Sequence, residues 1–235
     1  STQGYSSAAS DVYKRQIIAN EHNDLKTKFI QNISSQMEPT LNTLGASAKD
    51  LSAKAPQQAE QMQAQVAALK QFSDDIQELS LLENSLTEPY EMGEVNAGTF
   101  CENVMEKAKE FMKPDVTPSV NAPKLQVKTN KEQLERILLY LLKNAAFYTE
   151  QGRISLDFKK RGAHTHQFIR TDTGTGISAE QQENLFKPFT QVKDLTTGDG
   201  LGLPICSLIA TKMNGSLTLD TGYTKGCRFI LELHA

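Results

Sequence analysis

Two stretches with the apolar spacing of a helix, separated by one proline, dominate the first third of this chain. The first stripe steps by threes and fours from Leu25 to Leu51, and the second runs from Met62 to Leu79. Such steps place apolar side chains on one helix face, and Pro56 marks the break between two helices. One antiparallel hairpin has too little core of its own, so two hairpins are expected to pair as a four-helix bundle. A plain dimerisation stalk would have the same periodicity.

The first residues are set apart from the fold prediction. The stretch SSAASDVYKRQ, residues 6–16, resembles the in-frame translation of an adapter used in DNA sequencing libraries. We therefore predict three parts: residues 1–16 as an adapter artefact or disordered segment, residues 17–88 as the helical hairpin, and residues 89–235 as a second domain.

Charge and cysteine content exclude several classes of function. The chain has 25 basic and 28 acidic side chains and a formal net charge of −3, so it lacks the basic field that a nucleic-acid partner requires. The spacing of the three cysteines, Cys101, Cys206 and Cys227, fits neither a disulfide scaffold nor a metal site. This cysteine content is typical of a protein in a reducing cytoplasm. No apolar run long enough to span a membrane is present, so a membrane link would require a segment upstream.

After residue 88 short helices and strands follow one another without a single period. Helices are predicted from Thr99, in a capping box with Glu102, to about Met112, over 130–148, after Ser178 and after Gly202. Strands are predicted at 125–129, 153–159, 166–171, 216–219 and 228–233. Helices grouped with a mostly antiparallel sheet indicate an α+β sandwich.

The strongest chemical signal is TGDGLGLPIC, where alternating glycines run directly into a helix. Gly198, Gly200 and Gly202 let backbone N–H groups approach an anion without a Cβ in the way. The helix N-terminus adds free donors and a partial positive charge, so a polyphosphate is the predicted ligand. An ordinary glycine-rich turn is the alternative for this motif alone.

Two polar positions upstream suit the same kind of ligand. Asp172 ends a predicted strand two residues before Gly174, where a carboxylate can accept a hydrogen bond from an amine of a base. Asn144 lies on a mostly apolar helix, where an amide without a partner costs about 1–3 kcal/mol. A Mg²⁺ ion held between phosphates and one side-chain oxygen would supply that partner. A turn aspartate and a satisfied core asparagine are the alternatives.

The order of the motifs resembles that of the GHKL ATPases. A helical asparagine is followed by DTGTGI, LFKPF, GDGLGL and TKGCRF. The series is most similar to the ATP-binding domain of sensor histidine kinases, over about Pro89 to Ala235. The resemblance implies a Bergerat-type α/β sandwich with ATP and Mg²⁺ as cofactors.

The resemblance also assigns roles to matching residues. Asn144 would hold Mg²⁺, Tyr148 would lie beside the adenine, and Asp172 would accept a hydrogen bond from its amine. The other positions implied in binding are Gly174 and Gly176 around the base, Phe186 and Phe189 at the foot of a lid, Lys193 on that lid, and Gly198, Gly200, Leu201, Gly202 and Leu203 at the phosphates. Three positions depart from the family: Tyr140 replaces an asparagine, Phe147 a lysine, and Cys227 a serine or threonine.

The hairpin resembles the dimerisation and phosphoacceptor domain of the same kinases. FIQNISSQMEPTLN aligns without gaps to a motif like F-x-x-N-x-S-H-E-L-R-T-P-L-N. Ser35 then stands at the phosphorylated histidine and Gln36 at the acid that acts as base, while Pro39 comes one residue before the proline of the family. A serine hydroxyl without a base is a poor nucleophile beside imidazole, and glutamine cannot act as a base.

The resemblance implies a two-component sensor kinase that binds ATP and Mg²⁺ for phosphoryl transfer in signalling. Because Ser35 replaces the acceptor histidine and Gln36 replaces the neighbouring acid, the resemblance does not imply self-phosphorylation. The alternatives are a degenerate kinase that signals through nucleotide-dependent dimer conformation, and a GHKL serine kinase. The partners implied are a second copy of the chain and a response regulator or partner kinase. The implied location is the cytoplasm, including the cytoplasmic part of a membrane-anchored sensor.

Overall fold

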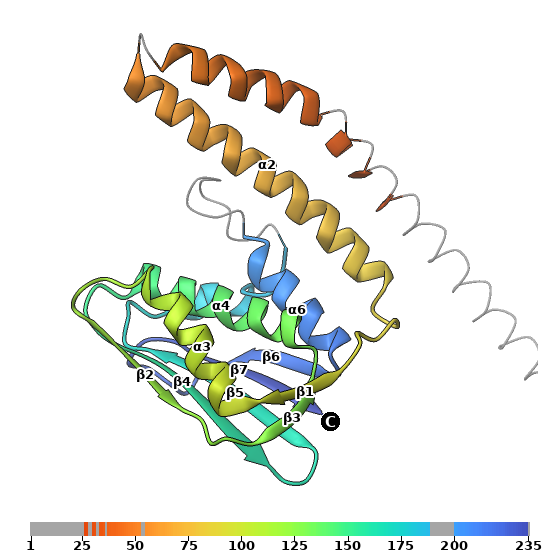
Figure 1. Ribbon diagram of the computed structural model, residues 1–235, viewed down its shortest axis with the longest axis vertical. Coiled ribbons are helices and arrows are strands. Elements are labelled where there is room, and N and C mark those ends of the chain that lie inside the picture. Colours follow the sequence, from red (N-terminus) through yellow and green to blue (C-terminus); the bar gives the residue numbers. More distant parts are fainter. Residues whose placement is uncertain are drawn as a thin grey trace, which may run out of the picture. The chain divides into compact units, whose positions relative to one another are not determined.

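The chain divides into two compact units. The computed structural model describes residues 26–52 with gaps at 28–29, 32 and 36, and then residues 55–188 and 200–234. One unit holds the described residues up to Ser85 together with Gly200 and Leu201. The other holds the described residues from Leu86 onward, except those two. Figure 1 shows the elements of both units.

The first unit is an antiparallel pair of helices (Figure 1). The described residues from 26 to 51 are helical, and the helix continues through Pro39. Helix α2 spans Pro56–Asn84, with its proline in the first turn, where the missing N–H costs nothing. The predicted helical hairpin is therefore confirmed.

The seam between these helices is narrower than the predicted stripe. On the first helix the buried positions are Ser34, Leu41 and Ala48, which are seven residues apart. Leu44 and Leu51 belong to the predicted stripe but are 40% and 41% exposed. One neighbouring helix covers only a heptad seam, whereas the apolar stripe of this helix is wider. Part of the predicted stripe is therefore left uncovered by the second helix.

The second unit places helices on one face of a five-stranded sheet. The helices are α3 (Ala97–Lys109), α4 (Lys131–Tyr148), α5 (Ala179–Glu183) and α6 (Gly202–Lys212). The strands are β1 (Gly93–Asn96), β2 (Val116–Asn121), β3 (Gln126–Thr129), β4 (Gly152–Arg161), β5 (Thr165–Asp172), β6 (Gly215–Leu219) and β7 (Arg228–His234). Helices α3, α4 and α6 lie over the sheet in Figure 1. Strands β1 and β3 form a separate antiparallel pair.

The strand order is β2-β4-β5-β7-β6, and the sheet is mixed. Strands β4, β5, β7 and β6 pair antiparallel, whereas β2 pairs parallel to β4. The α+β fold is confirmed, but β1 and β2 were not predicted. Pro118 interrupts the strand pattern of β2, which tolerates a proline because it lies at the edge of the sheet.

Local caps explain where the helices begin. Ser178 and Gln181 form a capping box at α5, and Asn130 caps α4. Helix α3 begins earlier than predicted, because the side chain of Asn96 accepts a hydrogen bond from the N–H of Thr99 at 3.1 Å. Thr99 therefore lies inside the first turn, and its assignment as the cap was wrong.

Among the residues that the structure describes, no helix is both long enough and apolar enough to span a membrane.

Candidate functional site

Asp172, the last residue of β5, has a fixed and almost fully occupied carboxylate. Its side chain is 3% exposed. Atom Oδ1 accepts hydrogen bonds from the backbone N–H groups of Gly174, at 2.9 Å, and Cys227, at 3.1 Å. Atom Oδ2 pairs with the guanidinium of Arg170. Two backbone amides and one cation therefore determine how this carboxylate is oriented.

Gly226 closes over Asp172 from the loop before β7. Its φ is +144°, and a Cβ at this position would come within 2.2 Å of the carbonyl oxygen of Asp172 and 2.9 Å of its Oδ1. Only glycine fits there without displacing the backbone. Gly226 was not among the predicted site residues, although the glycine in TKGCRF was a signal that could have identified it.

Arg170 is the site residue that the sequence prediction missed entirely. It lies two residues before Asp172 on β5 and therefore on the same face of the sheet, with its side chain 3% exposed. Its guanidinium lies 4.7 Å from the centre of the Phe229 ring, and Nε has no partner in the described part of the chain. Burial lowers the pKa of Arg170, and Asp172 opposes that shift. The available signal was a charged residue at a buried position of the strand alternation.

The turn after β5 connects to the end of α4. The N–H of Thr175 donates to the carbonyl oxygen of Tyr148 at 3.2 Å, and Gly176 has a φ of +74°. Tyr148 and Phe147 are 54% and 60% exposed, with ring centres 4.9 Å apart in an edge-to-face arrangement. The structure thus brings the end of α4 to the turn at Gly174, with exposed aromatic rings available for stacking.

The first turn of α6 is in close contact with α4. A Cβ on Gly202 would come within 2.2 Å of Cζ of Tyr140. Asn144 follows Tyr140 by one helical turn and so shares its side of α4. Gly200, with a φ of +71°, comes directly before the buried Leu201, and Leu203 is half-buried in the helix. The structure therefore places Asn144 on the side of α4 that faces the start of α6.

Asn144 was predicted as the ligand of a magnesium ion. Its side chain is half-buried and makes no hydrogen bond to any other residue that the structure describes. Within these described ranges, no group of three or more His, Cys, Asp or Glu side chains could hold a metal ion. Mg²⁺ commonly binds one or two protein oxygens together with substrate phosphates and water. The amide oxygen of Asn144 would fit that chemistry if phosphates bound at the first turn of α6.

Other predicted positions are placed only in part. Phe186 packs edge-to-face on Phe229, with ring centres 6.3 Å apart, so the LFKPF motif reaches the ring that also contacts Arg170. Ser35 lies exposed on the first helix. The remaining predicted residues, Gln36, Phe189, Lys193 and Gly198, lie outside the residues that the structure describes.

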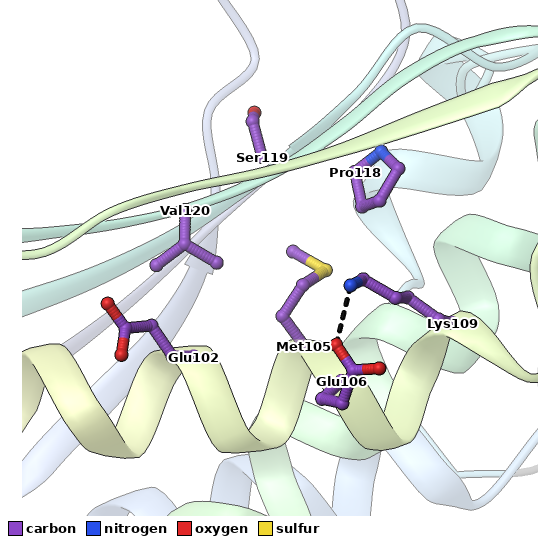
Figure 2. Close-up of a pocket in the computed structure, with 7 residues that line it drawn as sticks. All are labelled: Glu102, Met105, Glu106, Lys109, Pro118, Ser119 and Val120. Atoms are coloured by element: carbon purple, nitrogen blue, oxygen red, sulfur yellow. Dashed lines mark hydrogen bonds and ion pairs between the residues drawn. The ribbon is translucent and has the colours of Figure 1, made fainter.

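A hollow elsewhere on this unit lies between α3 and β2 (Figure 2). Its volume is about 270 Å³, and it is lined by Glu102, Met105, Glu106, Lys109, Pro118, Ser119 and Val120. Lys109 and Glu106 form an ion pair of 2.5 Å there. None of the predicted site residues lines this hollow, so it is separate from the site around Asp172.

Comparison with known proteins agrees with this geometry. Residues 129–235 match the family described as histidine kinase-, DNA gyrase B-, and HSP90-like ATPases. The aerobic respiration control sensor protein ArcB of Escherichia coli (strain K12) is 25% identical over 224 residues, covering 89% of this chain and 29% of ArcB. The sensor histidine kinase RppB of Synechocystis sp. is 34% identical over 126 residues, covering 51% of this chain and 27% of RppB.

A solved structure resembles the chain over a similar length. The crystal structure of full-length ShkA in complex with AMPPNP has a TM-score of 0.68 and 22% identity, covering 88% of this chain and 46% of that one. At that identity the likeness shows a shared fold. The chain spans less than a third of the length of ArcB and RppB. Residues 129–235 match the ATPase family of the histidine kinase, DNA gyrase B and HSP90 type, and the relatives and the shared fold together support a sensor histidine kinase core for the chain.

Proposed function

We propose that the C-terminal unit binds ATP with Mg²⁺ and that Asp172 contacts the amine of the adenine. The observation that supports this most strongly is the buried Asp172 carboxylate, held by the N–H groups of Gly174 and Cys227. It lies at the end of a strand, beside a glycine turn and exposed aromatic rings. ShkA, which shares the fold, was crystallised with AMPPNP.

In this proposal different residues contact the base, the phosphates and the metal ion. Tyr148 would cover the base, and Gly174 and Gly176 would shape the turn beneath it. The first turn of α6, from Gly202, would offer backbone N–H groups to the phosphates. Asn144 would hold Mg²⁺, which neutralises charge on the phosphates when it is bound. Lys193 and Gly198 would complete the phosphate side.

The helical unit is proposed to form a homodimer. The apolar faces of the two helices are only partly covered, and three leucines on them are exposed: Leu44 by 40%, Leu51 by 41% and Leu81 by 49%. A second hairpin would bury them in a four-helix bundle. The proposed partners beyond this dimer are a response regulator or a partner kinase.

The hairpin is proposed to signal by a change of shape rather than by self-phosphorylation. Ser35 stands at the position of the acceptor, and no histidine occurs among the hairpin residues that the structure describes. A serine hydroxyl requires a base to attack a phosphoryl group, and Gln36 cannot supply one. Transfer to Ser35, as in a serine kinase, is the second candidate because its side chain is exposed.

Calorimetric titration with ATP and Mg²⁺ tests the nucleotide site. We expect heat of binding for the wild-type chain and a loss of at least about tenfold in affinity for Asp172→Asn, because a hydrogen bond to a charged acceptor is lost. Asp220→Asn is the matched control, since Asp220 also pairs with an arginine of the same sheet. Absence of ATP binding by the folded wild-type chain would refute the proposal.

Labelling separates the two candidates for the hairpin. The chain is incubated with Mg²⁺ and γ-labelled ATP, and the label is then tested for stability in acid and base. Nucleotide binding without label supports signalling through shape. Acid-stable label that Ser35→Ala removes would establish the serine kinase, and acid-labile, base-stable label would show an ordinary histidine kinase reaction.

A further inference from the structure

We propose that Arg170 determines base specificity by occupying Asp172, which leaves that carboxylate one acceptor position for a ligand. This inference rests on the proposed nucleotide site and assigns it a positioning residue. The preferred ligand is a purine nucleotide with an exocyclic amine at position 6. Bases that present two adjacent N–H groups, or a carbonyl at that position, are disfavoured.

Most hydrogen-bond acceptor positions of the Asp172 carboxylate are already in use. A carboxylate offers about four lone-pair positions, two on each oxygen. On Oδ1 both are used, by the N–H groups of Gly174 and Cys227. On Oδ2 one is used by the guanidinium of Arg170. One position on Oδ2 therefore remains for a ligand.

Base specificity follows from the edges of the bases. On its Watson–Crick edge adenine presents one N–H of its amine, and Oδ2 of Asp172 can accept a hydrogen bond from it. Guanine presents two neighbouring N–H groups there, which need two acceptor positions. Because Arg170 leaves only one position free on Oδ2, one of these donors would be left without a partner on binding, at a cost in affinity. Hypoxanthine presents a carbonyl oxygen where adenine has its amine, and that oxygen would face a carboxylate.

Arg170 is enclosed by apolar side chains on the two neighbouring strands. The register of the sheet places it between Leu156 of β4 and Phe229 of β7. Both neighbours are buried and apolar, so the guanidinium cannot turn toward water and Asp172 is its ion-pair partner there. Removing one member of such a pair leaves a buried charge without compensation. Arg170 therefore keeps one acceptor position of Oδ2 occupied.

The experiment compares the affinities of ATP, ITP and GTP, each with Mg²⁺, by calorimetric titration of the full chain. For the wild type we expect a preference for ATP of at least about tenfold over both competitors. In Arg170→Met the two amide bonds to Oδ1 remain, but Oδ2 gains a second free acceptor position, so the preference for ATP over GTP should fall to about threefold or less. Arg170→Lys keeps a cation but not the planar fork, so an intermediate ratio is expected.

Arg228 provides a matched control on the neighbouring strand. It also pairs with an aspartate, Asp220, at 3.2 Å, and its guanidinium lies 4.2 Å from the centre of the Tyr223 ring. Its strand position pairs with Thr171, so it projects from the opposite face of the sheet from Arg170. Arg228→Met should leave the ratio of ATP to GTP affinity unchanged.

Circular dichroism and thermal melts establish which variants are folded. A folded Arg170→Met with the wild-type ratio would overturn the inference. If that variant is unfolded, Arg170→Lys decides: a lower ratio than the wild type supports the inference, and an equal ratio overturns it. A folded wild-type chain that binds none of the three nucleotides would refute the proposed function itself. ATP binding without any preference would refute the role of Arg170 alone.

Discussion

The two units of this chain use their apolar residues in different ways. In the C-terminal unit, side chains such as Leu138 and Leu141 of α4 are completely buried, and so are Ile154 and Leu156 of β4. In the helical unit, large apolar residues such as Leu44 and Leu81 are 40% or more exposed. A sheet covered by helices closes its own core, whereas two helices bury only a seam. The C-terminal unit should therefore be stable by itself, and the hairpin should depend on a second copy.

Truncating one leucine in each unit tests this difference most strongly. Leu141→Ala should lower the free energy of unfolding of the C-terminal unit by about 2–5 kcal/mol, because it leaves a cavity in a closed core. Leu44→Ala should change the unfolding of the single chain by no more than about 0.5 kcal/mol and weaken the dimer instead. Urea titration by circular dichroism measures the first effect, and sedimentation measures the second. Equal losses of stability in the two variants would contradict the comparison.

A methyl group on Gly226 tests how tightly the site is built. Gly226→Ala should destabilise the C-terminal unit by about 1–3 kcal/mol, because its φ is +144° and the new Cβ would overlap the backbone of Asp172. ATP affinity should fall with it. Gly93→Ala is the control, since a Cβ there meets no atom within 4 Å. Thermal melts and nucleotide titration measure both effects, and wild-type behaviour of Gly226→Ala would refute the close approach.

Thiol labelling reports on the C-terminal unit alone, because Cys101, Cys206 and Cys227 all lie there and are buried. Burial raises the pKa of Cys101 to about 12 and that of Cys227 to about 11, so both are protonated at neutral pH and react poorly. We expect labelling of the native chain to be at least about a hundredfold slower than in denaturant. ATP should slow the labelling of Cys227 further.

The raised pKa values of Cys101 and Cys227 predict how the stability of the C-terminal unit changes at high pH. The thiols of the unfolded chain lose their protons near pH 9, before those of the folded chain. Stability should therefore be constant below that pH and fall as the pH rises toward 11. Labelling rates measured from pH 8 to pH 10 test this. Rapid labelling at pH 8 would show that the unit opens readily and that the contrast with the hairpin is wrong.

The smallest expected effect concerns His166, which is buried on β5 and stacks on Phe158 with ring centres 5.8 Å apart. Burial lowers its pKa, and Lys160 and His164 lower it further. The unfolded chain then binds the proton more readily, so stability should decrease as the pH falls below about 6.5. His166→Phe should remove that slope, whereas His164→Gln should reduce it only slightly, because His164 is the smallest of the three causes of the shift. Urea titrations at pH 5.5 and 7.5 measure the difference.

Much of the fold could be predicted because its signals are local. The helical spacing indicated the hairpin, and Ser178 indicated the start of α5. Strand β2 was missed because Pro118 breaks its pattern, and only its place at the edge of the sheet makes that proline acceptable. The start of α3 was misplaced because Asn96 competes with Thr99 as a cap, and both are common capping residues.

The order of elements, the glycine turns and the position of Asp172 at the end of a strand can all be predicted from local sequence patterns. The groups that hold its carboxylate could be found only in the folded sheet: Cys227, which is 55 positions away in sequence, and the buried Arg170. Spacing along a strand sets the face that a side chain occupies, whereas strand pairing sets its neighbours. In the sequence alone, a charged residue at a buried strand position is unexpected. In the folded sheet, Arg170 has Asp172 as its counter-charge and the ring of Phe229 beside it.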